Sequence, residues 1–201
     1  MSNDRTQGYF VNLKYRLACG QLFLLLAATA SPAMAGSGAD PLVSLVDLAR
    51  QRNALADDVA LSKLRSGKPV QDAEREQAVI SAVRKGVPPR FSDEAARFFA
   101  AQIDSSKFVQ YALLWDWQVQ GRTPPSDQPD LENLRKRLDD LQAPLLSKLV
   151  EVLETPSPRP CRERVAAAVD AVPRQLPKED VLHQLALQQS FADFCHGTSA
   201  R

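Results

Sequence analysis

Residues 57–76 read DDVALSKLRSGKPVQDAERE, and this stretch together with the segment before it decides the fold. Apolar residues recur here at three- and four-residue intervals, at Leu42, Leu45, Ala49, Ala56 and Val59. That spacing is typical of one buried face of an α-helix. With Asp40 as N-cap and Pro41 in the first turn, it predicts a helix over residues 41–65.

Two cations fall on the same buried stripe. Arg52 and Lys63 are eleven positions apart, which at about 100° per residue turns their side chains to within about 20° of one direction. An unpaired buried charge is too costly to retain, so such a pair needs protein carboxylates or an anionic ligand between its head groups. The alternative is that Lys63, Arg65 and the neighbouring aspartates form an ordinary solvated helix surface. The charge pattern alone leaves both interpretations open.

A second charged cluster follows the turn signal SGKP at residues 66–69. Asp72 is well placed to cap a second helix that ends near Lys85. Asp72, Arg75 and Glu76 then stand at positions i, i+3 and i+4 and share one helix face.

The rest of the chain predicts further helices and no strand. Ser92 caps the longest of them, which runs uninterrupted by Gly or Pro for about 29 residues. Pro144 should kink or divide a later helix. The expected helices after the second one are residues 92–120, 130–143, 145–153, 161–172 and 178–195. The fold class is therefore all-α, a single-domain bundle of about six helices with one long central helix.

Three further polar residues lie on these helices. Ser106 and Gln110, four positions apart, share one face of the long helix, and Arg135 lies beside the apolar stripe of the next one. Periodicity alone allows all three to be ordinary surface residues.

The first 35 residues have the organisation of a secretory signal peptide. Basic residues precede an apolar run at residues 22–30, and AMA at residues 33–35 supplies a small-x-small cleavage site. The run is shorter than the roughly 20 residues of a membrane-spanning helix. We therefore expect cleavage near Ala35, a periplasmic or secreted location, and one domain over residues 36–201.

Cleavage also changes the charge of the protein. Loss of Asp4, Arg5, Lys14 and Arg16 takes the formal net charge from +1 to −1. A nearly neutral protein gives no electrostatic reason to expect nucleic acid or an anionic membrane surface as a partner.

Two cysteines remain after cleavage, Cys161 and Cys195. An even pair in an exported protein is typical of a disulfide, whereas a metal site would need more ligands than these two and His196. His183 and His196 are interpreted as surface or disulfide-flanking residues. We expect a structural disulfide near the C-terminus, and no cofactor or metal.

Taken in order, these features resemble a known family. Arg52, Lys63, SGKP at 66–69, Asp72-x-x-Arg75-Glu76, AAQIDSSKFVQY at 100–111, Arg135 and a C-terminal cysteine pair resemble the secreted all-helical chorismate mutases of the gamma subclass. The resemblance covers roughly residues 42–195. It implies a cofactor-free rearrangement of chorismate to prephenate in the periplasm, in a homodimer whose subunits each hold a complete site.

The resemblance also implies roles for individual residues. Arg135 and Arg52 would bind the two substrate carboxylates, and Lys63 would reach the enolpyruvyl carboxylate and the ether oxygen. Gln110 would be the second donor to that ether oxygen. The chain departs from the family at Leu64, where a tryptophan is often found.

The ring of the substrate would be held from the other side. Glu76, with Asp72 and Arg75 nearby, would bind the ring hydroxyl, and Ser106 would contact the region of the ring carboxylate. A concerted rearrangement needs only a dianion held in a compact conformation and donors at the breaking C–O bond. These residue types suit that chemistry.

Two other function classes remain open at this point. A non-enzymatic periplasmic binding protein or chaperone would keep the amphipathic helices but would need no convergence of Arg52, Lys63, Arg75 and Arg135. A related isochorismate lyase would use a similar cationic pocket. The sequence carries no G-x-S-x-G, H-E-x-x-H or phosphate-binding glycine loop.

Overall fold

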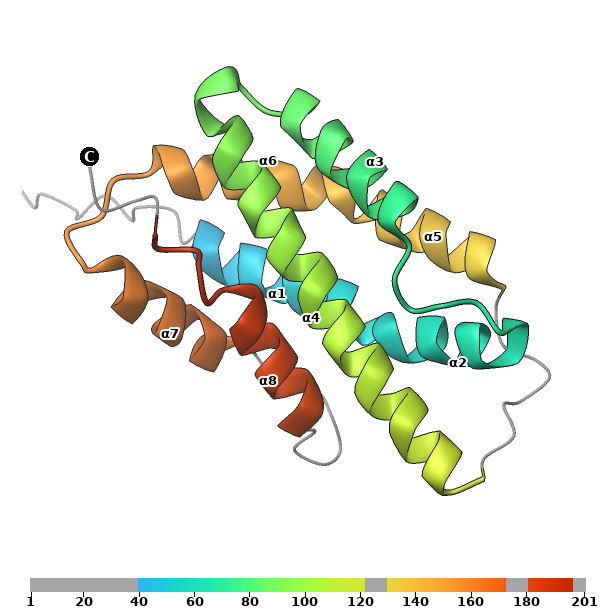
Figure 1. Ribbon diagram of the computed structural model, residues 1–201. Coiled ribbons are helices and arrows are strands. Elements are labelled where there is room, and N and C mark those ends of the chain that lie inside the picture. Colours follow the sequence, from blue (N-terminus) through green and yellow to red (C-terminus); the bar gives the residue numbers. More distant parts are fainter. Residues whose placement is uncertain (1–39, 122–129, 173–180, 197–201) are drawn as a thin grey trace, which may run out of the picture. The chain divides into compact units, whose positions relative to one another are not determined.

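The computed structural model describes residues 40–121, 130–172 and 181–196 (Figure 1). Every regular element within these ranges is a helix, eight α-helices and one short 3-10 helix, which confirms the all-α prediction. None of the described helices is long and apolar enough to cross a membrane. The predicted signal peptide and its cleavage site lie outside the described residues, so the domain boundary stays a prediction.

The first predicted helix is divided in two, which corrects the single helix expected over residues 41–65. Helix α1 spans Pro41–Ala54 and α2 spans Ala56–Ser66. The Leu55 N–H donates to the carbonyls of Arg52 and Asn53, so the regular i−4 pattern is interrupted there. The break places Asp57 and Asp58 in the first turn of a new helix, where the helix dipole favours acidic side chains. Gly67 then ends α2 in the left-handed conformation, at φ 66°.

Two helices form the next layer. Helix α3 spans Ala73–Lys85 with Asp72 as its N-cap, as predicted. The 3-10 helix Pro89–Phe91 leads into α4, Ser92–Val119, which at 28 residues is close to the predicted length. Ser92 is the first residue of α4, and its side chain does not cap the helix. The helix begins directly after Phe91, so carbonyls of the preceding 3-10 turn already accept from N–H groups at its start.

The predicted division at Pro144 occurs three residues earlier. Helix α5 spans Leu131–Asp140 with Asp130 as its N-cap, and α6 spans Gln142–Glu154, with the break at Leu141. Pro144 lies in the first turn of α6, where its missing N–H costs no helical hydrogen bond.

The last two helices carry the disulfide. Helix α7 spans Cys161–Ala171 and α8 spans Val181–Ser190, followed by turns to residue 196. The helix predicted over residues 178–195 therefore ends earlier, and its first three residues lie outside the described ranges. Cys161 and Cys195 are bonded, with their Cα atoms 5.7 Å apart, which confirms the predicted pair. His183 is more buried than expected and contacts Asp57 of α2 at 2.8 Å.

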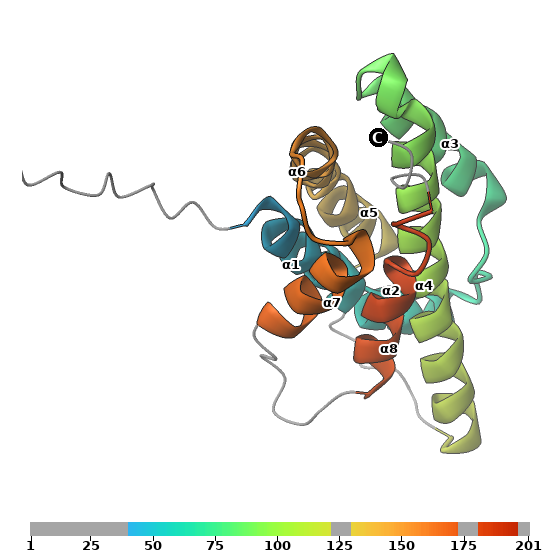
Figure 2. The ribbon, with the colours of Figure 1, turned by 90° about the vertical axis from the view of Figure 1, so that its left-hand side faces the viewer.

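The long helix α4 is the common support of the fold. It packs against α2, α3 and α8, while α1 packs against α6, α7 and α8 (Figures 1 and 2). Four phenylalanines form an edge-to-face cluster where α4 meets the end of the chain: Phe98, Phe99, Phe191 and Phe194. The apolar stripe predicted on α1 and α2 is buried throughout. This packing brings α2, α3 and α5 together beside the middle of α4.

We expect the disulfide to stabilise the fold but not to determine the arrangement of the helices. It closes a segment with a sequence separation of 34, so replacing both cysteines by serine should lower the free energy of unfolding by roughly 3–4 kcal/mol in the chain-entropy model. Urea unfolding followed by circular dichroism would measure the change. Dithiothreitol should destabilise the parent protein and leave the double variant unchanged. Equal unfolding midpoints for parent and variant would contradict a stabilising role.

Candidate active site

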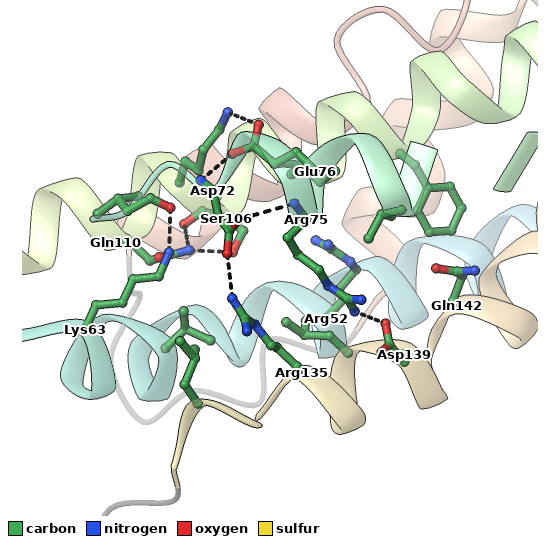
Figure 3. Close-up of a pocket in the computed structure, with 18 residues that line it drawn as sticks. Arg52, Lys63, Asp72, Arg75, Glu76, Ser106, Gln110, Arg135, Asp139 and Gln142 are labelled. Atoms are coloured by element: carbon green, nitrogen blue, oxygen red, sulfur yellow. Dashed lines mark hydrogen bonds and ion pairs between the residues drawn. The ribbon is translucent and has the colours of Figure 1, made fainter. Parts of the chain in front are cut away.

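One cavity is lined by all eight residues that the sequence singled out (Figure 3). Five helices contribute them: Arg52 from α1, Lys63 from α2, Asp72, Arg75 and Glu76 from the start of α3, Ser106 and Gln110 from α4, and Arg135 from α5. The structure therefore brings the eight together. The roles predicted for them stay predictions.

Arg52 and Lys63 are the most buried cations of the cavity, with 7% and 8% of their surface exposed. The alternative of a solvated surface is therefore wrong for Lys63. Arg52 donates through Nη1 to the Gln102 carbonyl at 2.9 Å, and Lys63 donates through Nζ to the Val70 carbonyl at 2.5 Å. Within the described ranges neither forms an ion pair with a carboxylate.

Burial changes the proton affinity of both groups. It lowers the pKa of Arg52 to about 10, helped by the charge of Arg75 and opposed by Asp139. Burial also lowers the pKa of Lys63, and Asp72 is the main charge that opposes this. An anion entering the cavity would favour the charged form of each group and so relieve part of this cost.

Asp72 connects the start of α3 to the cavity. Its Oδ1 accepts from the Arg75 N–H at 3.1 Å and caps the helix, while its Oδ2 accepts from Arg135 Nη2 at 2.5 Å. Arg75 in turn pairs through Nη2 with Asp139 of α5. The same few side chains thus start the helix and fix two guanidinium groups.

Both oxygens of Glu76 have donors. Oε1 accepts from the Asp72 N–H at 3.2 Å, and Oε2 accepts from Lys107 Nζ at 3.0 Å. Lys107 also contacts Asp104 Oδ1 at 2.9 Å. The carboxylate is therefore held between α3 and α4.

Ser106 and Gln110 are buried, with 8% and 4% of their surface exposed, so the interpretation as a surface patch is wrong for both. Gln110 Nε2 donates to the Ser106 carbonyl at 3.2 Å and to Ser106 Oγ at 3.1 Å. Its Oε1 is buried and has no hydrogen-bond partner among the residues that the structure describes. Buried polar atoms are normally paired, so this amide still has hydrogen-bonding capacity to offer.

Three polar residues of the cavity were not found from the sequence: Lys107, Asp139 and Gln142. Lys107 directly follows Ser106, but a lysine on a long helix carries no signal of its own. Asp139 and Gln142 flank the break between α5 and α6, which the sequence placed at Pro144 instead. Apolar side chains complete the wall of the cavity: Val59, Val70, Val79, Phe99, Ile103, Leu131 and Leu138.

The charges of the cavity do not balance. It holds five cations, Arg52, Lys63, Arg75, Lys107 and Arg135, and three carboxylates, Asp72, Glu76 and Asp139. Each carboxylate pairs with one of these cations: Asp72 with Arg135, Glu76 with Lys107, and Asp139 with Arg75. Two positive charges remain, on Arg52 and Lys63, and they suit a ligand with two negative charges. Among the described residues, no three His, Cys, Asp or Glu side chains are placed to hold a metal ion.

Comparison with known proteins identifies the family. The chain is 34% identical over 187 residues to the secreted chorismate mutase of Mycolicibacterium smegmatis, covering 85% of this chain and 99% of that protein. This chain belongs to the chorismate mutases. The secreted chorismate mutase of Mycobacterium tuberculosis is 27% identical over 190 residues, 92% of this chain and 94% of its own. The crystal structure of chorismate mutase from Burkholderia thailandensis superposes with a TM-score of 0.68 at 33% identity, covering 77% of this chain and 99% of that one.

The family model, chorismate mutase type II, matches residues 43–111. Seven of the eight cavity residues predicted from the sequence lie in that range, and Arg135 lies beyond it. The cavity is thus built mainly from the part of the chain that carries the chorismate mutase pattern, and α5 completes it.

The low proton affinity of Lys63 can be measured directly in this chorismate mutase. Because burial disfavours the ammonium form, Lys63 should lose its proton at a lower pH than the ordinary value of 10.5. NMR of protein with ¹³C-labelled lysine side chains would follow the titration, and Lys63→Arg would assign the signal. Titration at or above 10.5 in the ligand-free protein would contradict the effect of burial.

Proposed function

We propose that this cavity converts chorismate to prephenate by direct rearrangement of the bound substrate. The observation that carries the proposal is the pair of buried cations, Arg52 and Lys63, which have no carboxylate partner among the described residues, in a cavity whose other charges are paired. Chorismate carries two carboxylates and an apolar ring. The surplus charge and the apolar wall match both parts.

In this proposal the cations hold the two carboxylates. Arg52 and Arg135 bind one each, and Lys63 reaches the enolpyruvyl carboxylate together with the ether oxygen. Arg52 and Lys63 are anchored to main-chain carbonyls at 2.9 and 2.5 Å. Their head groups are therefore oriented before the substrate arrives, which reduces the cost of ordering them.

Gln110 is the second donor at the ether oxygen. Its Nε2 is bonded to Ser106, and its Oε1 has no partner among the described residues. A half-turn of the amide, at the cost of its bond to the Ser106 carbonyl, would let Oε1 accept from the Ser106 hydroxyl and turn Nε2 towards the ether oxygen. Glu76, beside Asp72 and Arg75, accepts from the ring hydroxyl, and Ser106 contacts the region of the ring carboxylate.

The reaction needs modest help from each group. A millionfold acceleration corresponds to about 8 kcal/mol. Hydrogen bonds to charged groups contribute roughly 1.5–3 kcal/mol each, so a few donors suffice where they act more strongly on the transition state than on chorismate. Negative charge grows on the oxygen of the breaking C–O bond, which is where Lys63 and Gln110 are proposed to donate.

A direct assay tests the proposal. Purified protein should consume chorismate, followed by its ultraviolet absorbance, and form an equal amount of prephenate without added metal or cofactor. Consumption of isochorismate instead would favour the lyase alternative, and no turnover of either compound would contradict an enzymatic role.

Lys63→Ala should lower kcat/KM by well over tenfold, because a donor and its charge both leave a buried site. Lys68→Ala is the matched control, since Lys68 is exposed on the loop after α2 and does not line the cavity. Steady-state kinetics with chorismate would compare the three proteins. A loss below about tenfold, or ~1.4 kcal/mol, would remove Lys63 from the proposed role.

Gln110→Glu should confine activity to acidic pH. An amide can donate at any ordinary pH, whereas a glutamate donates only when protonated and would otherwise repel the developing negative charge. The parent should show no such dependence between about pH 5 and 8. Profiles of kcat/KM against pH would show the difference. Parallel profiles, with the variant fully active at neutral pH, would show that Gln110 does not touch the reacting oxygen.

We further propose that the enzyme acts as a homodimer in the periplasm, after cleavage near Ala35, and belongs to the gamma subclass. The signal-like sequence of residues 1–35 and the secreted relatives support export. A single chain supplies all eight proposed site residues to the cavity, so the proposed dimer is not needed to complete the site. N-terminal sequencing of the processed protein tests the cleavage near Ala35, and light scattering tests the homodimer.

A further inference from the structure

We propose that Lys107 is a positioning residue that neutralises and orients Glu76, so that this carboxylate can bind the ring hydroxyl without repelling the dianionic substrate. The inference rests on the role proposed above for Glu76. It adds a residue for which neither the sequence pattern nor the resemblance gave any role.

The contacts of Lys107 support this role. Its Nζ lies 3.0 Å from Glu76 Oε2 and 2.9 Å from Asp104 Oδ1. The other oxygen of Glu76 accepts from the Asp72 N–H at 3.2 Å. Each carboxylate oxygen has two lone pairs, so with one donor on each oxygen Glu76 keeps a fixed orientation and still has acceptor capacity for a substrate hydroxyl.

The charge pattern of the cavity explains why a cation is needed there. Asp72 and Asp139 are each neutralised by an arginine on a neighbouring helix. Lys107 neutralises Glu76 in the same way. Lys63, the other lysine of the cavity, is bonded to the Val70 carbonyl and not to Glu76. Without Lys107, Glu76 would present an uncompensated negative charge to a substrate with two carboxylates, which weakens binding.

Lys107 is suited to hold its charge. It is about four-fifths buried, as is Glu76, so solvent weakens their attraction less than at an exposed pair. Burial alone would lower the pKa of Lys107, but its hydrogen bonds to Asp104 and Glu76 outweigh this and raise the pKa. Lys107 therefore carries its positive charge at neutral pH.

A double-mutant cycle separates this role from a general loss of structure. Lys107→Met should raise KM for chorismate by about tenfold with a smaller change in kcat, because the uncompensated charge of Glu76 repels the substrate carboxylates. In a Glu76→Gln background the same Lys107→Met change should alter KM by less than about twofold, since no charge is left to neutralise. Lys107→Arg should restore most of the parent KM.

The control is Lys136→Met, which removes a lysine that pairs with Asp140 on the exposed face of α5, outside the cavity. It should leave KM unchanged, and melting temperatures should show that all variants fold. If Glu76→Gln impairs the kinetics with chorismate but Lys107→Met leaves KM unchanged, the inference is overturned and the proposed function stays intact. A penalty of Lys107→Met that is the same in both backgrounds would also overturn it. A silent Glu76→Gln would instead refute the proposed role of Glu76, and the inference with it.

Discussion

The fold depends on one constraint, the burial of two cations that no carboxylate of the described residues neutralises. Arg52 and Lys63 lie on the apolar stripe of α1 and α2 and must make hydrogen bonds there. Main-chain carbonyls of Gln102 and Val70 accept one hydrogen bond from each of them, which does not neutralise their charge. Burial of these two charges is electrostatically unfavourable, and a bound dianion would offset that cost, so the same feature that costs stability favours an anionic ligand.

The start of α3 shows how the remaining charges are fixed with few residues. Asp72 caps the helix with one oxygen and holds Arg135 with the other, and its own N–H donates to Glu76. The helix terminus and the site therefore form together. Because these contacts all start from Asp72, the backbone conformation of the turn before α3 must be fixed. Gly67 adopts the left-handed conformation that lets the chain turn there.

Burial and helix starts can be predicted from the sequence where they depend on one helix face or on a local capping residue. The place of Arg52 and Lys63 on an apolar stripe favoured their burial, and the caps Asp40 and Asp72 followed from local rules. Helix boundaries were predicted wrongly where two local signals competed. Asp57 and Asp58 favour the start of a new helix, although no Gly or Pro there marks the end of the preceding one. Pro144 favours a break, although the first turn of a helix tolerates a proline.

Contacts between distant segments could not be predicted from spacing at all. Lys107 with Glu76 and Arg75 with Asp139 join residues on different helices, and nothing in either local pattern names the partner. The resemblance supplied the family residues but not these two pairs, because a pair that only positions another residue leaves no motif of its own.

The two ends of the fold carry different tasks, and the long helix α4 connects them. Near its N-terminal end, Phe98 packs against Phe191 and Phe194, close in sequence to the disulfide at Cys195. Further along, Ser106, Lys107 and Gln110 face the cavity. Neither cysteine lines that cavity, so the covalent link stabilises the fold at a distance from the chemistry, whereas Phe99 belongs to both the aromatic cluster and the cavity wall. A rigid helix held in this way keeps three polar side chains at fixed heights along one axis. A reaction that relies on positioned charges, without a covalent intermediate, requires that kind of support.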